Sequence, residues 1–430
     1  MIGVGAAGPT GAWATSAEPS VAPGRVTPAT TALRGPAPLT ERQAWAVLTW
    51  VDGLGPVGFG ALLRAFGSGR AVLEAALRPG ATRRLVEAGV VDDRESFDAT
   101  TAGAIEAVAE DPRAVLRRIE IPGVEILTTE DAAYPSRLLS IELPPHVLFV
   151  RGSVGAMAAD HAVAVVGTRR PTEAGRATAG RIGGSLAKAG AVVVSGLAVG
   201  IDGASHAAAM AEGAPTVAVL GSGHGRLYPR AHAKLAERIV ADGGTVVSEF
   251  VPERPPSVYT FPRRNRLISG LADATVVVEA GARSGALITA AWALEQGRDL
   301  YMVPGSIDAP QSAGCLEWIH RYPGQARVVP SIPQLIEDLE LFGGTTRRGR
   351  RPSLNAELIE LGATARAIAE ELIRGRGTVD ELVAATGHSV ATLLGALTML
   401  EMRGLATSAY GRYRPAGRLA TAPRGPVRRG

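Results

Sequence analysis

The chain has 430 residues, 46% of them hydrophobic, and a formal net charge of +4, so it can build several domains and tolerates a polyanionic partner without requiring one. Its single cysteine, Cys315, excludes an intrachain disulfide framework and a multi-cysteine metal site. The sequence contains neither a signal peptide nor a run of about 20 apolar residues, so we expect a cytoplasmic protein with no metal, no cofactor and no membrane partner.

Residues 1–38 are rich in Ala, Gly, Pro, Thr and Ser, and we expect them to form a disordered leader. Residues 39–120 have a helical pattern, in which Thr40 and Gln43 predict the start of the first helix. A glycine-rich turn over 52–58 leads to a second helix over 59–66. This is the pattern of a helix-hairpin-helix or SAM-like module, whose hairpin amides can face a DNA phosphate. The hairpin contains no Lys or Arg, which favours a plain turn between helices.

Residues 121–335 alternate short Val-rich runs with glycine-rich turns and helical patterns. The expected strands are 163–166, 191–194, 216–220, 245–248, 274–278 and 300–303; the expected helices are 173–189, a segment from about Gly203, 231–241 and 286–296. Continuous apolar runs suit strands that are covered on both faces. The predicted fold class is therefore α/β, with an extended Rossmann-like, doubly wound and mostly parallel sheet whose ligands bind beyond the carboxyl ends of the strands.

The C-terminal third predicts a linker and a further module. Residues 336–360 hold an Arg-rich linker, and residues 361–415 have the pattern of a winged-helix domain, with helices over 365–374, 379–385 and 390–403 and a two-stranded wing around Gly411. The third helix lacks the Arg, Lys, Asn and Gln that read DNA bases, which favours protein docking or an accessory role. Residues 416–430 are expected to be a disordered tail.

Four glycine-rich segments of the central domain are candidates for phosphate binding: 167–171, 195–202, 263–270 and 281–289. We expect all four to be loops at one edge of the sheet, where backbone amides and helix N-termini favour anions. Arg169, Arg264 and Arg266 would add full charges, and Phe261 would offer a base a surface to stack on. Asp202 would repel phosphate, and it could cap the following helix or accept a hydrogen bond from an arginine. For the four segments together, phosphate binding is favoured over four tight turns.

A series of motifs follows in order: 131–135 with 144–152, 165–169, 195–202, 261–271, 279–285 with 289–290, and 303–305 with 312–314. In this series the chain resembles the DNA-processing protein A family (DprA, also called Smf). The resemblance implies a homodimer that binds single-stranded DNA, protects incoming DNA during natural transformation, loads RecA recombinase onto it and is not an enzyme. The chain departs from the family's pattern at His232, at 316–319 and at 322–324.

The loops and the resemblance together give a set of predicted DNA- and phosphate-binding residues. They are Gly167, Thr168, Arg169, Ser195, Gly196, Gly200, Asp202, Arg230, Phe261, Arg264, Asn265, Arg266, Ser284, Gly285 and Thr289. No catalytic residue and no metal ligand is predicted.

The alternative is an enzyme of the related nucleotide-cleaving Rossmann class, such as a phosphoribohydrolase of the cytokinin type. Those enzymes look similar in their phosphate loop, and they carry a catalytic Glu on the helix that follows it. Here Leu287 and Ile288 stand near the place of that Glu, which disfavours this alternative.

Overall fold

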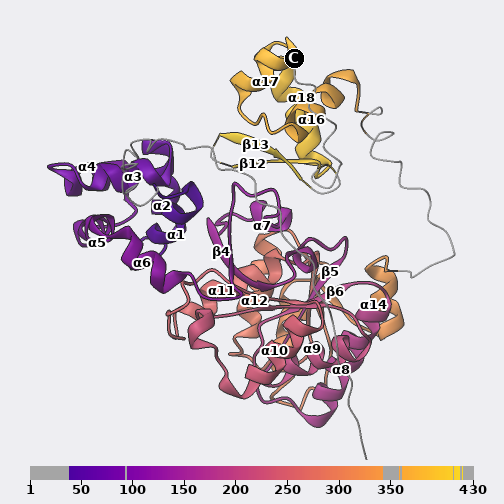
Figure 1. The fold of residues 1–430 in the computed structure, drawn as a ribbon. Coiled ribbons are helices and arrows are strands. Elements are labelled where there is room, and N and C mark those ends of the chain that lie inside the picture. The colour runs from indigo at the N-terminus through magenta and orange to yellow at the C-terminus, as the bar shows by residue number, and fades with distance from the viewer. Residues whose placement is uncertain are drawn as a thin grey trace, which may run out of the picture. The chain divides into compact units, whose positions relative to one another are not determined.

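The computed structural model describes residues 38–92, 94–341, 358, 361–409, 411–416 and 419 (Figure 1). The expected leader lies outside these residues except for Pro38, as do most of the expected linker and most of the expected C-terminal tail.

The N-terminal region is a set of short helices packed around an apolar core. They are α1 Glu41–Leu48, α2 Pro56–Phe66, α3 Gly69–Ala76, α4 Ala81–Ala88, α5 Ala99–Glu110 and α6 Pro112–Ile119, with a small antiparallel pair of β1 Val90–Val91 and β2 Arg94–Glu95. The predicted start of α1 is confirmed, because the Thr40 hydroxyl accepts from the Gln43 N–H and the Gln43 side chain accepts from the Thr40 N–H.

The turn between α1 and α2 packs against its own module. Gly53 has a φ of +89°, in the left-handed region that favours glycine. A Cβ at this position would lie 2.4 Å from Thr101 Oγ1 of α5, so the absence of a side chain lets the turn close against that helix. Pro56 then occupies the first turn of α2, where its missing N–H costs nothing.

The central region is a nine-stranded sheet in the order β11-β10-β9-β5-β6-β7-β8-β4-β3. The strands are β3 Glu125–Thr128, β4 Val147–Gly152, β5 Ala162–Val166, β6 Val192–Ser195, β7 Thr216–Val219, β8 Thr245–Ser248, β9 Ala274–Val277, β10 Asp299–Met302 and β11 Ala326–Val328. Strands β5 to β11 pair in parallel, which confirms the predicted mostly parallel sheet. The antiparallel edge formed by β3 and β4 was not predicted.

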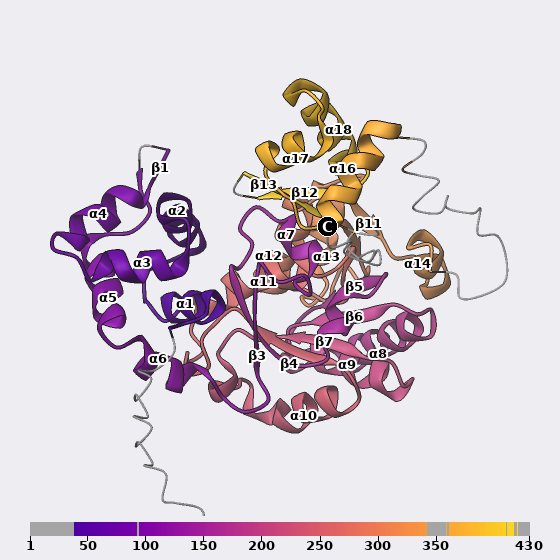
Figure 2. The same ribbon diagram turned by 45° about the horizontal axis from the view of Figure 1, so that its top comes forward.

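Helices cover both faces of this sheet (Figures 1 and 2). One face packs against α11 Thr260–Gly270, α12 Ala286–Glu295 and α13 Ala313–Arg321; the other packs against α8 Glu173–Lys188, α9 Ile201–Ala211, α10 Ala233–Ala241 and α14 Ile332–Asp338. Along β6, Val192 and Val194 face the first group of helices while Val193 faces the second. This double cover explains why the strands read as continuous apolar runs.

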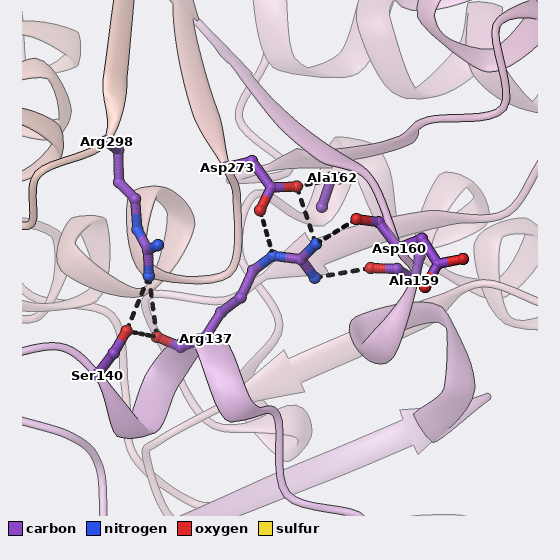
Figure 3. A network of polar contacts seen from close by, with 7 residues as sticks. All are labelled: Arg137, Ser140, Ala159, Asp160, Ala162, Asp273 and Arg298. Carbon is purple, nitrogen blue, oxygen red and sulfur yellow. Dashed lines mark hydrogen bonds and ion pairs between the residues drawn. The ribbon is translucent and has the colours of Figure 1, made fainter. Parts of the chain in front are cut away.

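A polar network holds the short helix α7, Ser136–Leu139, at the amino ends of the central strands (Figure 3). The Arg137 guanidinium donates to both carboxylate oxygens of Asp273, at 2.7 and 2.8 Å, and to two backbone carbonyls of the segment before β5. Asp273 also accepts from the Ala162 N–H, and Arg298 donates to the Ser140 hydroxyl. These charge-assisted hydrogen bonds tie α7 to the segments before β5 and β9.

The C-terminal region has the predicted winged-helix arrangement. It contains α16 Ala363–Ile373, α17 Val379–Thr386, α18 Val390–Met402 and the antiparallel pair β12 Ala406–Ala409 and β13 Arg412–Pro415. A capping box between Thr378 and Glu381 begins α17. Among the described residues no single helix has the length and apolar character to cross a membrane, whereas α17 and α18, bent by 110°, satisfy that length and composition only as a pair.

Candidate nucleic-acid interface

The order of the central strands creates a switch point beside β5. From β5 the chain winds outward through β6, β7 and β8, and it then returns through α11 to β9 on the other side of β5. The loops after β5 and β9 meet there, where the Thr168 N–H donates to the Glu279 carbonyl at 2.7 Å. Ligands of doubly wound sheets bind at this kind of position, beyond the carboxyl ends of the strands.

Internal carboxylates accept hydrogen bonds from the loops that precede two helices at this edge. At the start of α8 the Glu279 side chain accepts from the Thr172 N–H at 2.9 Å and from the Thr172 hydroxyl. In the loop between β6 and α9 the Gly196 and Ala198 N–H groups donate to the Asp202 side chain, at 3.1 and 3.3 Å. These loop donors are therefore already engaged inside the protein and are not available to a bound phosphate.

Asp202 therefore has neither of the two roles expected for it: it holds loop amides instead of capping α9 or accepting a hydrogen bond from an arginine. Its side chain is buried beside the Arg264 guanidinium. Burial raises the pKa of this carboxyl group, while the charge of Arg264 and the two loop amides act in the opposite direction.

The segment 263–270, expected to be a strand-end loop, is helical, and this corrects the prediction. It forms most of α11, in which Arg264 is only 4% exposed. The Arg264 guanidinium donates to the Gly196 carbonyl at 2.9 Å, to the Val219 carbonyl, and to Asn265 Oδ1 at 3.1 Å. Burial lowers the pKa of Arg264 to about 10. This side chain is buried, and its Nε and Nη1 atoms are engaged with groups of the protein.

Arg266 is equally buried, on the other side of α11. Its guanidinium makes a bidentate ion pair with Glu249, at 2.7 and 3.2 Å, and both side chains are at most 3% exposed. Arg263 reaches the same carboxylate at 3.3 Å but keeps 44% of its side chain exposed. Of the three arginines in this cluster, the structure turns only Arg263 outward.

Phe261 stands at the start of α11, among charged and aromatic groups. The Arg169 guanidinium lies 5.1 Å from the centre of its ring, and the Tyr228 ring lies 5.7 Å away. A Cβ at Gly221 would lie 2.5 Å from the Phe261 ring, so this glycine leaves room for it. Phe261 is half-buried and thus offers a fixed aromatic surface at the edge.

Exposed arginines lie in the segments that follow several strands at this edge. They follow β5, β7, β8 and β9, and they are Arg169, Arg170, Arg226, Arg230, Arg263 and Arg283. Only Arg169 and Arg230 belong to the set predicted from the sequence. The others lie in or near the same segments, but neighbouring arginines look alike in a sequence, and only the backbone decides which of them face outward.

Several other predicted residues are engaged in internal hydrogen bonds or buried at this edge. The Ser195 hydroxyl is buried and donates to the Val165 carbonyl at 2.6 Å, and Thr289 is buried. Asn265 donates to the Gly285 carbonyl at 3.1 Å, which ties α11 to the start of α12, and the Ser284 hydroxyl accepts from the Ala286 N–H at 3.3 Å.

Two predicted glycines allow close packing between loops. A Cβ at Gly167 would lie 2.6 Å from Ile201, and a Cβ at Gly200 would lie 2.5 Å from the Thr168 carbonyl oxygen. His232, a departure from the family's pattern, places its Nδ1 at 2.9 Å from the Leu197 carbonyl and so helps to hold the β6–α9 loop.

The place of the catalytic Glu in the alternative enzyme class is apolar in the structure. Leu287 is buried against the core, and Ile288 is exposed on the first turn of α12. Neither side chain can exchange a proton, so this helix carries no acid or base at that place.

Comparison with known proteins connects this fold and edge to one family. The family model described as DNA recombination-mediator protein A matches residues 125–340, and the DprA winged helix domain matches residues 352–412. The chain is 35% identical over 385 residues to a putative DNA processing protein DprA of Mycobacterium tuberculosis, covering 86% of this chain and 94% of that protein.

Two further relatives match a smaller part. Protein Smf of Escherichia coli is 43% identical over 226 residues, and the match spans 52% of this chain and 59% of that protein. The X-ray structure of DNA processing protein A from Streptococcus pneumoniae superposes with a TM-score of 0.58 at 28% identity, covering 71% of this chain and 99% of that one. The family consists of DNA-processing proteins and not of enzymes. The chain belongs to the DprA/Smf family of DNA recombination mediators.

Proposed function

We propose that this protein binds single-stranded DNA across the carboxyl edge of its sheet. The observation that carries the proposal is the set of exposed arginines in the segments after β5, β7, β8 and β9, together with the half-buried Phe261, beside which the Arg169 guanidinium lies. Guanidinium groups bind phosphate oxygens in any sequence, and an aromatic face accepts any base, so this combination suits a strand without sequence preference. Arg264 and Arg266 are buried and act indirectly, because their hydrogen bonds to other parts of the chain hold the segments of this edge in place.

Replacing Arg169 with alanine tests the proposal. The variant is expected to bind a labelled single-stranded oligonucleotide about tenfold more weakly, because one charge-assisted phosphate contact is lost. Its affinity should also depend less steeply on salt, by about 0.7 in the logarithmic slope for one phosphate of a single strand. Fluorescence anisotropy across a salt series measures both quantities.

Arg181 supplies the matched control, because it is an exposed arginine on α8. Arg181→Ala removes the same charge from the whole protein but should keep the wild-type affinity and slope. Equal losses in both variants would show that only net charge matters, and would count against this edge as the binding site.

We further propose that the protein acts in the cytoplasm as a homodimer that protects incoming DNA and loads RecA recombinase onto it during natural transformation. The family description as a recombination mediator supports this proposal. The expected result is faster assembly of RecA on a strand precoated with single-strand-binding protein. An assembly rate that does not change when the protein is added would remove the RecA part of the proposal and leave the binding part intact.

A further inference from the structure

Exposed large apolar side chains gather at the carboxyl edge of the sheet. Between residues 121 and 341 the exposed ones are Val199, Tyr228, Val258, Tyr259, Ile288, Ile307 and Val328. Val328 lies on β11 itself, whereas the other six lie in the segments that follow β6, β7, β8, β9 and β10. We call these six residues the apolar rim.

Single exposed apolar residues are common on soluble proteins and need no explanation. The apolar rim differs because each of five successive parallel strands is followed by at least one of its members, at the edge that also carries the exposed arginines. Apolar groups beside cations match the chemistry of a single nucleic-acid strand, whose bases are uncovered and whose backbone is anionic. A duplex keeps its bases stacked inside and offers no such match.

The two tyrosines of the apolar rim are the members best suited to stacking. Tyr259 is 83% exposed and directly precedes α11, two residues before Phe261. Tyr228 is 43% exposed, and its ring lies 5.7 Å from the Phe261 ring at an angle of 57°. Arg263 is exposed on the first turn of α11, so Tyr259 has a cation close by along the chain.

We propose that Tyr259 and Tyr228 stack on bases of a bound single strand whose phosphates contact the surrounding arginines. This proposal rests on the proposed single-strand binding, and it names the side chains that select an unpaired strand over a duplex. Phosphate contacts alone would not make that selection, because a duplex presents the same anionic groups.

The experiment compares two oligonucleotides of equal length, a thymidine strand and an abasic strand with the same phosphates. The wild-type protein should bind the thymidine strand more tightly. Tyr259→Ala should weaken binding to the thymidine strand roughly tenfold and leave binding to the abasic strand unchanged. Tyr259→Trp should keep the preference, since its ring also stacks. Val328→Ala, which removes an exposed apolar side chain from a strand at the far end of the sheet, is the matched control and should behave as the wild type.

Three outcomes would overturn the inference. Wild-type affinity of Tyr259→Ala for the thymidine strand would exclude stacking by this ring, while the proposed function would stand. Equal weakening on both strands would assign Tyr259 to the backbone or to the fold. A change in the sedimentation of the free Tyr259→Ala protein would assign the apolar rim to contact between copies. Absence of wild-type binding to either strand would instead refute the proposed function itself.

Discussion

Arg266→Ala is expected to lower the free energy of unfolding by about 3–5 kcal/mol, because it leaves the Glu249 carboxylate buried without its main partner. In the native protein two hydrogen bonds, at 2.7 and 3.2 Å, join these side chains, and the Glu249 side chain is only 1% exposed. Arg263 contacts the same carboxylate from the surface at 3.3 Å and cannot replace the lost pair, because nearly half of it is solvated. Denaturation in urea measures the effect.

The same carboxylate provides the control. Arg263→Ala removes the exposed partner of Glu249 and should cost no more than about 1 kcal/mol, as exposed ion pairs do. The two variants should also differ in binding, because only Arg263 presents its guanidinium at the surface. A similar loss of stability in both variants would mean that the burial of Arg266 does not control the strength of this ion pair.

The second large effect is expected in mild acid and originates at His206. This ring is fully buried in α9, where its Nδ1 lies 2.7 Å from the Thr216 hydroxyl. The Thr216 hydroxyl donates its own hydrogen to the Val193 carbonyl, so His206 Nδ1 carries the proton in this contact. The other nitrogen, Nε2, is buried with no hydrogen-bond partner among the described residues. A second proton would place a charge there without compensation.

Burial accordingly lowers the pKa of His206 to about 3, from an ordinary value of about 6.5. Between these two pKa values His206 is protonated in the unfolded chain and neutral in the folded protein, so the free energy of unfolding falls as the pH falls. One such group costs about 1.4 kcal/mol per pH unit, or roughly 3 kcal/mol between about pH 6 and pH 4. Well above about pH 6.5 this histidine is neutral in both the folded and the unfolded state, so it no longer contributes to the pH dependence of stability.

His206→Asn isolates this contribution, because the amide can still donate to Thr216 but does not titrate. As the pH is lowered, the free energy of unfolding of this variant should fall less steeply than that of the wild type. The difference in slope should correspond to one proton, or about 1.4 kcal/mol per pH unit. Parallel curves for the two proteins between about pH 6 and pH 4 would show that His206 is not the group responsible.

The sheet could be predicted from the sequence because its parallel strands are covered on both faces. Burial on both sides leaves an uninterrupted run such as Val163–Val166, and the observed β5 extends this run by one residue. The edge strand β3 is half-exposed and begins with Glu125, so its pattern is weak. Its antiparallel pairing with β4 depends on contacts far apart in the sequence, which no local pattern carries.

The segment of α11 shows why the site was harder to predict. As a sequence, the segment 263–270 groups with the glycine-rich loops, yet it lies in a helix whose first turn contains Pro262, where proline is tolerated. The partners that bury two of the arginines come from elsewhere in the chain: Glu249 for Arg266, and the Gly196 and Val219 carbonyls for Arg264. The sequence could show that arginines gather here, whereas their inward or outward direction depends on tertiary contacts.

The Asp202 carboxylate in the loop between β6 and α9 has a consequence for competition inside a cell. A free nucleotide that sought the amides of Gly196 and Ala198 would have to displace Asp202, which these amides and a neighbouring buried guanidinium already hold. Under the proposed function a long strand would need none of those donors, because it would engage several outer arginines at once, and each contact would raise the effective concentration for the next. Abundant mononucleotides would therefore be poor inhibitors, and the protein would respond to the length of a phosphate chain rather than to phosphate itself.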